Sequence, residues 1–374
     1  MKFIDEFRNP ALARRLVEQI TREAQAYGAQ ARDGRGPVRL MEFCGGHTHA
    51  IFRFGLRQML APHVELHSGP GCPVCVTAAA DLDRAIALAE IPGVILATFG
   101  DMVRVPGGHG TLQDARARGA DVRIVYSPLD ALQAARQNLE RPVVFLGIGF
   151  ETTAPTIAAA LVQAETEDLP NFSVLSLHKL TPPAMRAILD AGEVALDGIV
   201  GPGHVSAVIG SEAWNFLPRE YRIPCAISGF EPLDILGAVA ALVHAAVMDD
   251  PTVVNAYGRG VSPQGNQVAQ RMMDRVFEIG PAEWRGFGSV PASGLTLRET
   301  FAHRDAARLF PVEIEPAEEP PGCRCGEVLR GVITPTECPL FRRVCSPRNP
   351  IGPCMVSSEG ACAAYYKYGE ETPE

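Results

Sequence analysis

Short apolar runs, many of them rich in β-branched residues, alternate with alanine-rich helical stretches over residues 38–248, and this alternation indicates the fold class. The runs that predict strands are residues 38–43, 64–67, 94–98, 122–125, 143–147, 173–177, 198–200 and 225–228. Helices are expected at residues 78–89, 130–138, 156–164, 183–190 and 233–248. Such an alternation predicts parallel sheets with helices on both faces. Loops at the carboxyl ends of parallel strands carry the chemistry in such folds, so functional residues are expected there.

The pattern divides the chain into four expected parts. These are a helical segment at residues 1–36, a first α/β domain at 37–140, a second α/β domain at 141–250 and a C-terminal domain at 251–374. Within the last part we expect helical spacing over 251–284, a loop at 286–294 and an exposed connection at 311–322. Two short motifs recur. GPGC at residues 69–72 resembles GPGH at 201–204, and GFE at 149–151 is repeated at 229–231. These recurrences indicate two related lobes.

Composition narrows the function classes. The 374 residues carry a formal net charge of −9 and no basic cluster beyond short pairs such as Arg342-Arg343, which argues against nucleic acid or a membrane surface as partner. No N-terminal apolar signal is visible, and the apolar run at 235–248 is too short to span a bilayer. We therefore expect a cytoplasmic protein, in which ten cysteines serve as metal ligands or redox thiols more readily than as structural disulfides.

The motif Cys44-Gly45-Gly46-His47 follows the expected strand at 38–43 and leads into a helix near Thr48. Thiol and imidazole groups are versatile metal ligands, and the two glycines let the backbone approach a ligand closely. A buried cysteine at a strand end is the plain structural alternative.

Cys72-Pro73-Val74-Cys75 is a C-x-x-C motif after a strand. A helix N-terminus there lowers the pKa of the first thiol, and the motif is typical of an exposed pair that cycles between dithiol and disulfide. Half of a zinc knuckle is the alternative, disfavoured because the sequence holds no second C-x-x-C.

Six further cysteines lie near the C-terminus, at Cys323, Cys325, Cys338, Cys345, Cys354 and Cys362. Six thiols exceed the four that one zinc ion or one [4Fe–4S] cluster takes. The flanking prolines and the wide spacing favour an iron–sulfur cluster over zinc and both over disulfides, but spacing alone does not select four ligands.

Other motifs are less specific. The segment at 147–155 lacks the lysine of a P-loop, and Glu151 with its two following threonines also suits a capping role. Asp101 and Arg104 can pair simply to brace their loop, and His178 and His204, each taken singly, suit structural roles.

Several motifs together resemble the HypD family of hydrogenase maturation factors, in the family's order and over nearly the whole chain. They are FCGGHTH at 43–49, GPGCPVC at 69–75, FGDM at 99–102, GFETTAP at 149–155, GPGH at 201–204 and CMVSSEGAC at 354–362.

The resemblance implies a scaffold that builds the Fe(CN)2CO unit of [NiFe]-hydrogenases with the small partner HypC and the cyanide donor HypE. It implies two related α/β domains and a third, Cys-rich iron–sulfur domain formed by the chain ends, so that residues 1–36 pack with the C-terminal domain. The family's cluster spacing falls on Cys323, Cys338, Cys345 and Cys362, although Cys325 also fits as first ligand. Cys325 and Cys354 are then left as a second thiol pair.

The resemblance also implies roles for individual side chains. A thiolate from Cys44 suits a low-spin ferrous ion carrying cyanide and CO, with His47 nearby to bind, orient or move protons. The pair Cys72 and Cys75 would relay electrons from the [4Fe–4S] cluster, through Cys325 and Cys354, toward the iron or its ligands. Glu359 would ligate, relay protons or hydrogen-bond near the cluster. Glu151 and Thr152 would line the cleft.

Two other function classes remain as alternatives. A self-contained Fe–S thiol oxidoreductase would use Cys72 and Cys75 on a small substrate, but the sequence offers no credible nucleotide or flavin motif. A zinc-stabilised binding protein would hold zinc in the C-terminal cysteines. The assembly scaffold is favoured over both.

Overall fold

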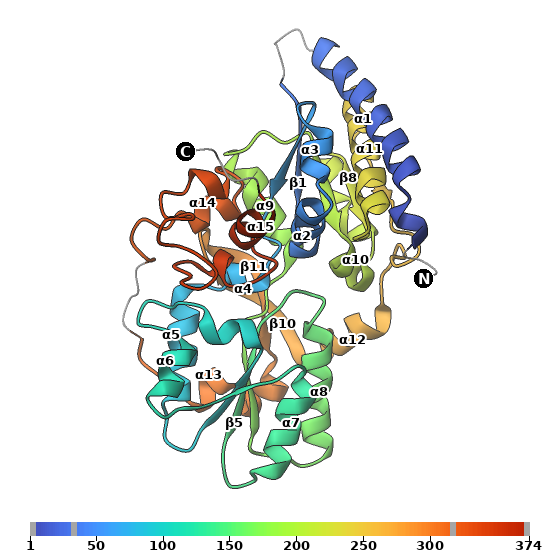
Figure 1. Cartoon of the computed structure of the whole chain (residues 1–374). Helices are drawn as coiled ribbons and strands as arrows, with labels where there is room; N and C mark the ends of the chain where they lie inside the picture. The colour runs from blue at the N-terminus through green and yellow to red at the C-terminus, as the bar shows by residue number, and fades with distance from the viewer. Residues whose placement is uncertain (1–4, 31–35, 315–318, 370–374) are drawn as a thin grey trace.

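Two parallel β-sheets form two lobes of the molecule, seen one above the other in Figure 1, in a computed structural model that describes residues 5–30, 36–314 and 319–369. The five-stranded lobe has the order β2 (Val64–Ser68), β1 (Val38–Glu42), β7 (Gly198–Pro202), β8 (Cys225–Ser228) and β9 (Val253–Asn255). The four-stranded lobe has the order β4 (Asp121–Ile124), β3 (Ile95–Thr98), β5 (Val143–Gly147) and β6 (Phe172–Ser176). All neighbours in both sheets are parallel, which confirms the predicted α/β class.

The central strands are apolar because helices cover both faces of each sheet. Every residue of β3, β5, β7 and β8 is buried. The longer helices on the sheets are α1 (Pro10–Gln30), α5 (Ala79–Ala89), α7 (Pro128–Gln137), α8 (Ala154–Thr166), α9 (Thr181–Ala191) and α11 (Pro232–Met248). Shorter ones are α2 (Gly45–Arg53), α3 (Leu56–Leu60), α4 (Pro73–Val76), α6 (Leu112–Ala117) and α10 (Gly203–Ile209), with turns η1 (Asp5–Arg8), η2 (Gly100–Arg104), η3 (Glu212–Trp214) and η4 (Leu217–Tyr221).

The assignment of strands to the two lobes differs from the predicted one, which divides the two α/β domains at residue 140. Strand β1 pairs with β7, about 160 residues later, whereas β5 joins β3 in the other sheet. The four-stranded lobe is thus an insertion between β2 and β7. The two GFE motifs lie in different lobes, whereas GPGC and GPGH both follow or end strands of the five-stranded sheet.

The N-terminal helix packs in a different place from the one that the resemblance implies. Helix α1 lies along α11, and its residues Ile20 and Ala24 are buried in one cluster with Leu236 and Val239. In Figure 1 it covers the outer side of the five-stranded lobe, opposite the Cys-rich region. The apolar stripe of α1 therefore covers α11, an almost wholly apolar helix that needs a partner. Residues 1–4 and 31–35 of the predicted segment lie outside the described residues.

An antiparallel hairpin, β10 (Phe277–Trp284) and β11 (Gly288–Leu297), replaces much of what the sequence predicts as helix and loop. Helical spacing over 251–284 is correct only for α12 (Gln267–Val276), and the loop predicted at 286–294 is mostly strand. The error has a physical cause: β10 is buried mainly at its two ends, so its alternation is weak.

The Cys-rich region, residues 319–369, follows η5 (Glu299–Arg304) and α13 (Ala306–Leu309). Its elements are α14 (Cys325–Leu329), η6 (Pro335–Glu337), η7 (Pro353–Met355) and α15 (Ala361–Tyr368). Of the connection predicted at 311–322, residues 315–318 lie outside the described part, as do residues 370–374 of the last domain. Helix α15 packs on α2, so this region covers the motif that begins at Cys44.

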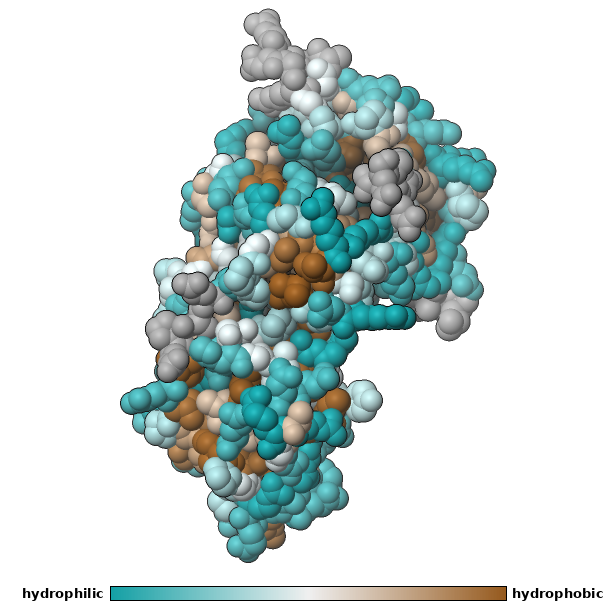
Figure 2. Space-filling model, turned by 60° about the vertical axis from the view of Figure 1, so that its left-hand side comes forward, coloured by the Kyte–Doolittle hydropathy of each residue, from teal (hydrophilic) through white to brown (hydrophobic). Residues whose placement is uncertain are grey.

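The surface on the side of the Cys-rich region is mostly hydrophilic, with separate apolar patches (Figure 2). Within the described ranges, no helix combines the length and the apolar character needed to cross a membrane.

Candidate functional site

Cys44 sits where β1 passes into α2, as its position after a strand predicts. It precedes the first helical residue, and its backbone N–H donates to the Glu42 carboxylate at 2.8 Å. The GPGC turn lies directly against it: Gly45 N–H donates to Gly71 O at 2.9 Å, and a Cβ at Gly71 would lie only 2.2 Å from Cys44 N. The free thiol and the C-x-x-C motif therefore stand on two touching turns.

Two carboxylates surround Cys44. Glu42 is buried and accepts hydrogen bonds from the Cys44 N–H and the Thr48 hydroxyl, while burial raises its pKa to about 7. Glu359 reaches over α2 from the Cys-rich region, close to Gly45. Burial, followed by the charges of Glu359 and Glu42, raises the pKa of Cys44 to about 12. Cys44 is thus a neutral thiol at pH 7, and a bound cation would offset the negative charge that its thiolate adds.

His47 is a buried, neutral imidazole. Its Nε2 lies 3.2 Å from Ser228 O and 3.0 Å from Gly229 O, and because carbonyl oxygens only accept, Nε2 carries the hydrogen. Burial lowers its pKa to about 4. Its Nδ1 is buried without a hydrogen-bond partner among the described residues. The Phe230 ring stacks on His47 at 4.7 Å and on His204 at 3.9 Å, so the second GFE motif supports the first histidine.

Cys72 and Cys75 form a disulfide at the start of α4, and Cys75 N–H donates to Cys72 Sγ at 3.1 Å. The sequence predicts an exposed pair, but their exposed fractions are only 3% and 0%. The Cys-rich region contributes to this burial, because η7 packs on α4. Small molecules in solution therefore have little access to either sulfur.

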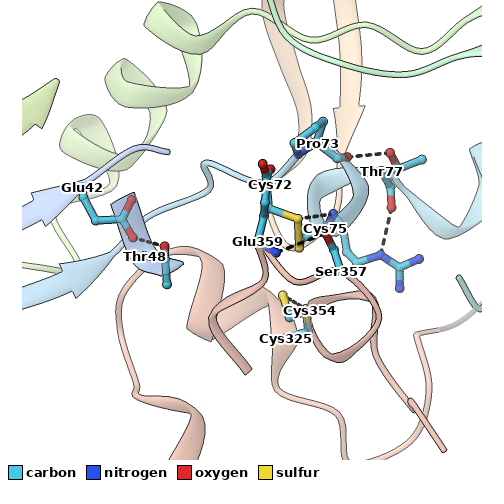
Figure 3. The surroundings of a disulfide bond; sticks show 11 residues. Glu42, Thr48, Cys72, Pro73, Cys75, Thr77, Cys325, Cys354, Ser357 and Glu359 are labelled. Carbon is cyan, nitrogen blue, oxygen red and sulfur yellow. Dashed lines mark hydrogen bonds between the residues drawn. A yellow bond between two sulfur atoms is a disulfide. The ribbon is translucent and has the colours of Figure 1, made fainter. Parts of the chain in front are cut away.

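The six C-terminal cysteines all line one pocket with Val328, Leu340, Phe341 and Met355. Cys325 Sγ and Cys354 Sγ lie 2.7 Å apart, and both residues are buried. Figure 3 shows this pair below the Cys72–Cys75 disulfide, with Ser357 and Glu359 alongside. Hydrogen bonds with Cys323 and Cys354 lower the pKa of Cys325.

The other four cysteines, Cys323, Cys338, Cys345 and Cys362, provide the thiol count of a [4Fe–4S] cluster in an apolar setting, so the residues fit that group. In the described ranges no three or more His, Cys, Asp or Glu side chains are arranged to hold a metal ion.

Glu151 has a local role in the four-stranded lobe. Its carboxylate accepts hydrogen bonds from the Thr181 N–H at 2.8 Å and the Thr181 hydroxyl at 2.9 Å, at the start of α9. Burial raises its pKa to about 7. These contacts match the capping alternative, although the helix capped is α9 rather than the one that follows Glu151. Thr152, beside it, is half-buried.

Arg104 does not brace its own loop. It donates to Pro347 O at 3.3 Å and Val356 O at 3.5 Å, which ties η2 to the Cys-rich region.

Three side chains that support the site, Glu42, Phe230 and Arg285, are not among the residues predicted from the sequence. Arg285 is buried in the hairpin, and its Nε donates to Thr77 O at 2.9 Å, directly after α4. A carboxylate two residues before Cys44 was a usable signal for Glu42. The recurrence of the GFE motif at 229–231 is a usable signal for Phe230. Arg285 gave none, because its contacts depend on a hairpin that the sequence did not predict.

Comparisons with known proteins confirm the resemblance to the HypD family. The family model described as "HypD: Hydrogenase formation hypA family" matches residues 11–369. The chain is 50% identical to the hydrogenase maturation factor HypD of Azotobacter vinelandii over 99% of this chain and 98% of the relative. It is 47% identical to the hydrogenase maturation factor HypD of Rhodobacter capsulatus, over 99% of this chain and 98% of the relative. It is 45% identical to the corresponding protein of Escherichia coli strain K12, over 100% of both chains. The chain therefore belongs to the HypD family, whose relatives named here are hydrogenase maturation factors.

Proposed function

We propose that this chain is a redox-active scaffold in the cytoplasm, on which the Fe(CN)2CO unit of [NiFe]-hydrogenase is assembled with HypC and with cyanide from HypE. One observation carries the proposal: the free thiol of Cys44 and the Cys72–Cys75 disulfide stand on turns in direct contact through Gly71. The thiol that would bind iron is therefore adjacent to a disulfide that can accept two electrons.

In this proposal iron is the cargo. Cys44 gives it a thiolate ligand, and HypC supplies the remaining protein ligands. The proton that leaves Cys44 has the carboxylates of Glu42 and Glu359 as neighbours, and both have pKa values raised by burial, which makes them better proton acceptors. His47, held through Nε2 by two carbonyl oxygens, positions the start of α2.

The relay uses the two cysteine pairs. Cys325 and Cys354 exchange with the Cys72–Cys75 disulfide and so deliver two electrons toward the iron site. A [4Fe–4S] cluster held by Cys323, Cys338, Cys345 and Cys362 would supply single electrons when bound.

The thiol oxidoreductase alternative requires an accessible active pair. The four sulfur-bearing residues of the two pairs are at most 4% exposed, which favours exchange within the protein over turnover of a small substrate.

The test combines genetic complementation with a turnover assay. In a strain lacking its own HypD, the wild-type chain should restore hydrogenase activity, whereas Cys44→Ala and Cys72→Ser should not, and Cys225→Ser, a buried strand cysteine, serves as control. Without HypC, the purified protein should not turn over a small disulfide substrate. Steady turnover with no HypC, retained in Cys44→Ala, would support the oxidoreductase instead.

A further inference from the structure

The tip of the β10–β11 hairpin lies between the two elements that carry the cysteine pairs. On one side, Trp284 bridges to Thr77 and Arg285 N–H donates to Val76 O at 2.9 Å, directly after Cys75. On the other side, Gly286 touches Gly326 at the start of α14. One short turn therefore contacts both the α4 segment and the helix that begins with Cys325.

The contact with α14 is between backbones. A Cβ at Gly286 would lie 2.4 Å from Gly326 Cα, and a Cβ at Gly326 would lie 2.8 Å from Gly286 Cα. No side chain fits at either position without moving the two segments apart. The separation of the hairpin tip from α14 is consequently fixed by two glycines.

Arg285 fixes the contact with α4. The residue is 2% exposed; its Nε donates to Thr77 O at 2.9 Å and its Nη2 to Pro106 O at 3.1 Å, and its Nη1 pairs with Glu319. A planar guanidinium can bind three acceptors in fixed directions, whereas a lysine ammonium is a single point charge on a flexible stem.

We infer that Arg285 is a positioning residue for thiol–disulfide exchange: through the hairpin tip it holds α4 and α14 in the register that lets the two cysteine pairs react. The inference rests on the relay in the proposed function. A thiolate of the Cys325–Cys354 pair attacks one sulfur of the Cys72–Cys75 disulfide, forms a mixed disulfide and releases the other sulfur as a thiolate, which takes up the proton. The second thiol of the pair then loses its proton and attacks the mixed disulfide, which releases the remaining sulfur of Cys72 or Cys75 as a thiolate that takes up that proton. Cys325 and Cys354 become the disulfide, Cys72 and Cys75 become the dithiol, and two electrons have moved.

Geometry controls such a step because both pairs are buried and no external thiol can substitute for a misplaced one. An error of about 1 Å in a reacting pair can cost about a hundredfold in rate. In Arg285→Lys the backbone contacts of the tip with Val76 and Thr77 remain, but the guanidinium bonds that fix the orientation of α4 are lost, while the contact with α14 is unchanged.

The experiment is disulfide trapping in the full-length protein under anaerobic conditions. One cysteine of each pair is changed to serine, in all four combinations, so that no disulfide can form within either pair. The peptide masses distinguish the disulfide between the pairs from disulfides with the other cysteines that line the pocket. Diamide accepts the two electrons and two protons, and mass spectrometry of peptides follows cross-linking over time. In the combination that cross-links fastest, we expect Arg285→Lys to lower the rate by about tenfold or more.

Arg304→Lys is the matched control. Arg304 is 4% exposed, donates to Leu169 O and Phe172 O and pairs with Glu165, but it lies in the four-stranded lobe. Arg304→Lys should cross-link at the parent rate even if its thermal midpoint falls as far as that of Arg285→Lys.

Each outcome decides between claims. Parent-rate cross-linking in Arg285→Lys would overturn the inference and leave the relay standing. If all four combinations with Arg285 intact fail to cross-link, the relay itself is overturned. Gly326→Ala keeps Arg285 but separates the tip from α14, so it should also slow trapping. If Arg285→Lys does not fold, a folded Gly326→Ala protein that cross-links at the parent rate would overturn the inference.

Discussion

Replacing Glu151 with glutamine should remove a pH-dependent loss of stability. Burial raises the pKa of this carboxyl from 4.5 to about 7, so the folded chain favours its neutral form. The loss of folding free energy caused by Glu151 is absent below pH 4.5, grows as the pH rises and is complete above about pH 7. At about 1.4 kcal/mol per pH unit, it amounts to about 3 kcal/mol. Glutamine cannot ionise, yet its carbonyl can accept from the Thr181 N–H and its amide can donate to the Thr181 hydroxyl.

The assay is urea unfolding of the wild type and Glu151→Gln at several pH values. The variant's free energy of unfolding, relative to the wild type, should rise by about 3 kcal/mol between pH 4.5 and pH 8. Thr181→Val is the control: it removes the hydroxyl that favours the carboxylate, so its stability should fall more steeply with pH than that of the wild type. A relative stability of Glu151→Gln that does not change with pH would refute the reasoning.

Three further perturbations test the neighbourhood of Cys44 and the Cys-rich pocket. Gly71→Ala places a Cβ 2.2 Å from Cys44 N and should lower the thermal midpoint, whereas Gly237→Ala, with no heavy atom within 4 Å, should not; equal midpoints would contradict the contact. Glu359→Gln removes a negative charge that raises the pKa of Cys44, so the thiol should alkylate faster at pH 8; an unchanged or slower rate would contradict that influence. Cys338→Ser should lose the visible absorbance of a bound cluster while Cys44→Ser keeps it, and retained absorbance in Cys338→Ser would remove that residue from the ligand set.

Local patterns made the strands and the α/β class predictable, whereas the assignment of strands to the two lobes depends on long-range pairing and was not predictable. Each of the eight strands predicted within 38–248 is present, with ends shifted by at most about two residues. Their apolar runs reflect burial on both faces, a property of the segment itself. The pairing of β1 with β7 depends on a crossover through an entire inserted lobe, and no neighbouring residue encodes it.

The same difference between local patterns and long-range contacts applies to the candidate site. Cys44 and the C-x-x-C motif were placed correctly at strand ends, because the turn glycines beside them are local signals. The burial of Cys72 and Cys75 was not predictable, since it depends in part on contacts with the Cys-rich region about 280 residues later. The role of Glu151 depended on where α9 begins, so the sequence left its capping alternative open.

The most direct test of the account is infrared spectroscopy of the anaerobically co-purified complex of this chain with HypC, wild type against Cys44→Ala. If the proposed scaffold role is correct, the wild type should show cyanide and CO stretching bands and the variant should lose them. Bands that persist without the Cys44 thiol would contradict its role as the iron ligand. A wild-type complex with an intact cluster and no such bands would contradict the scaffold itself.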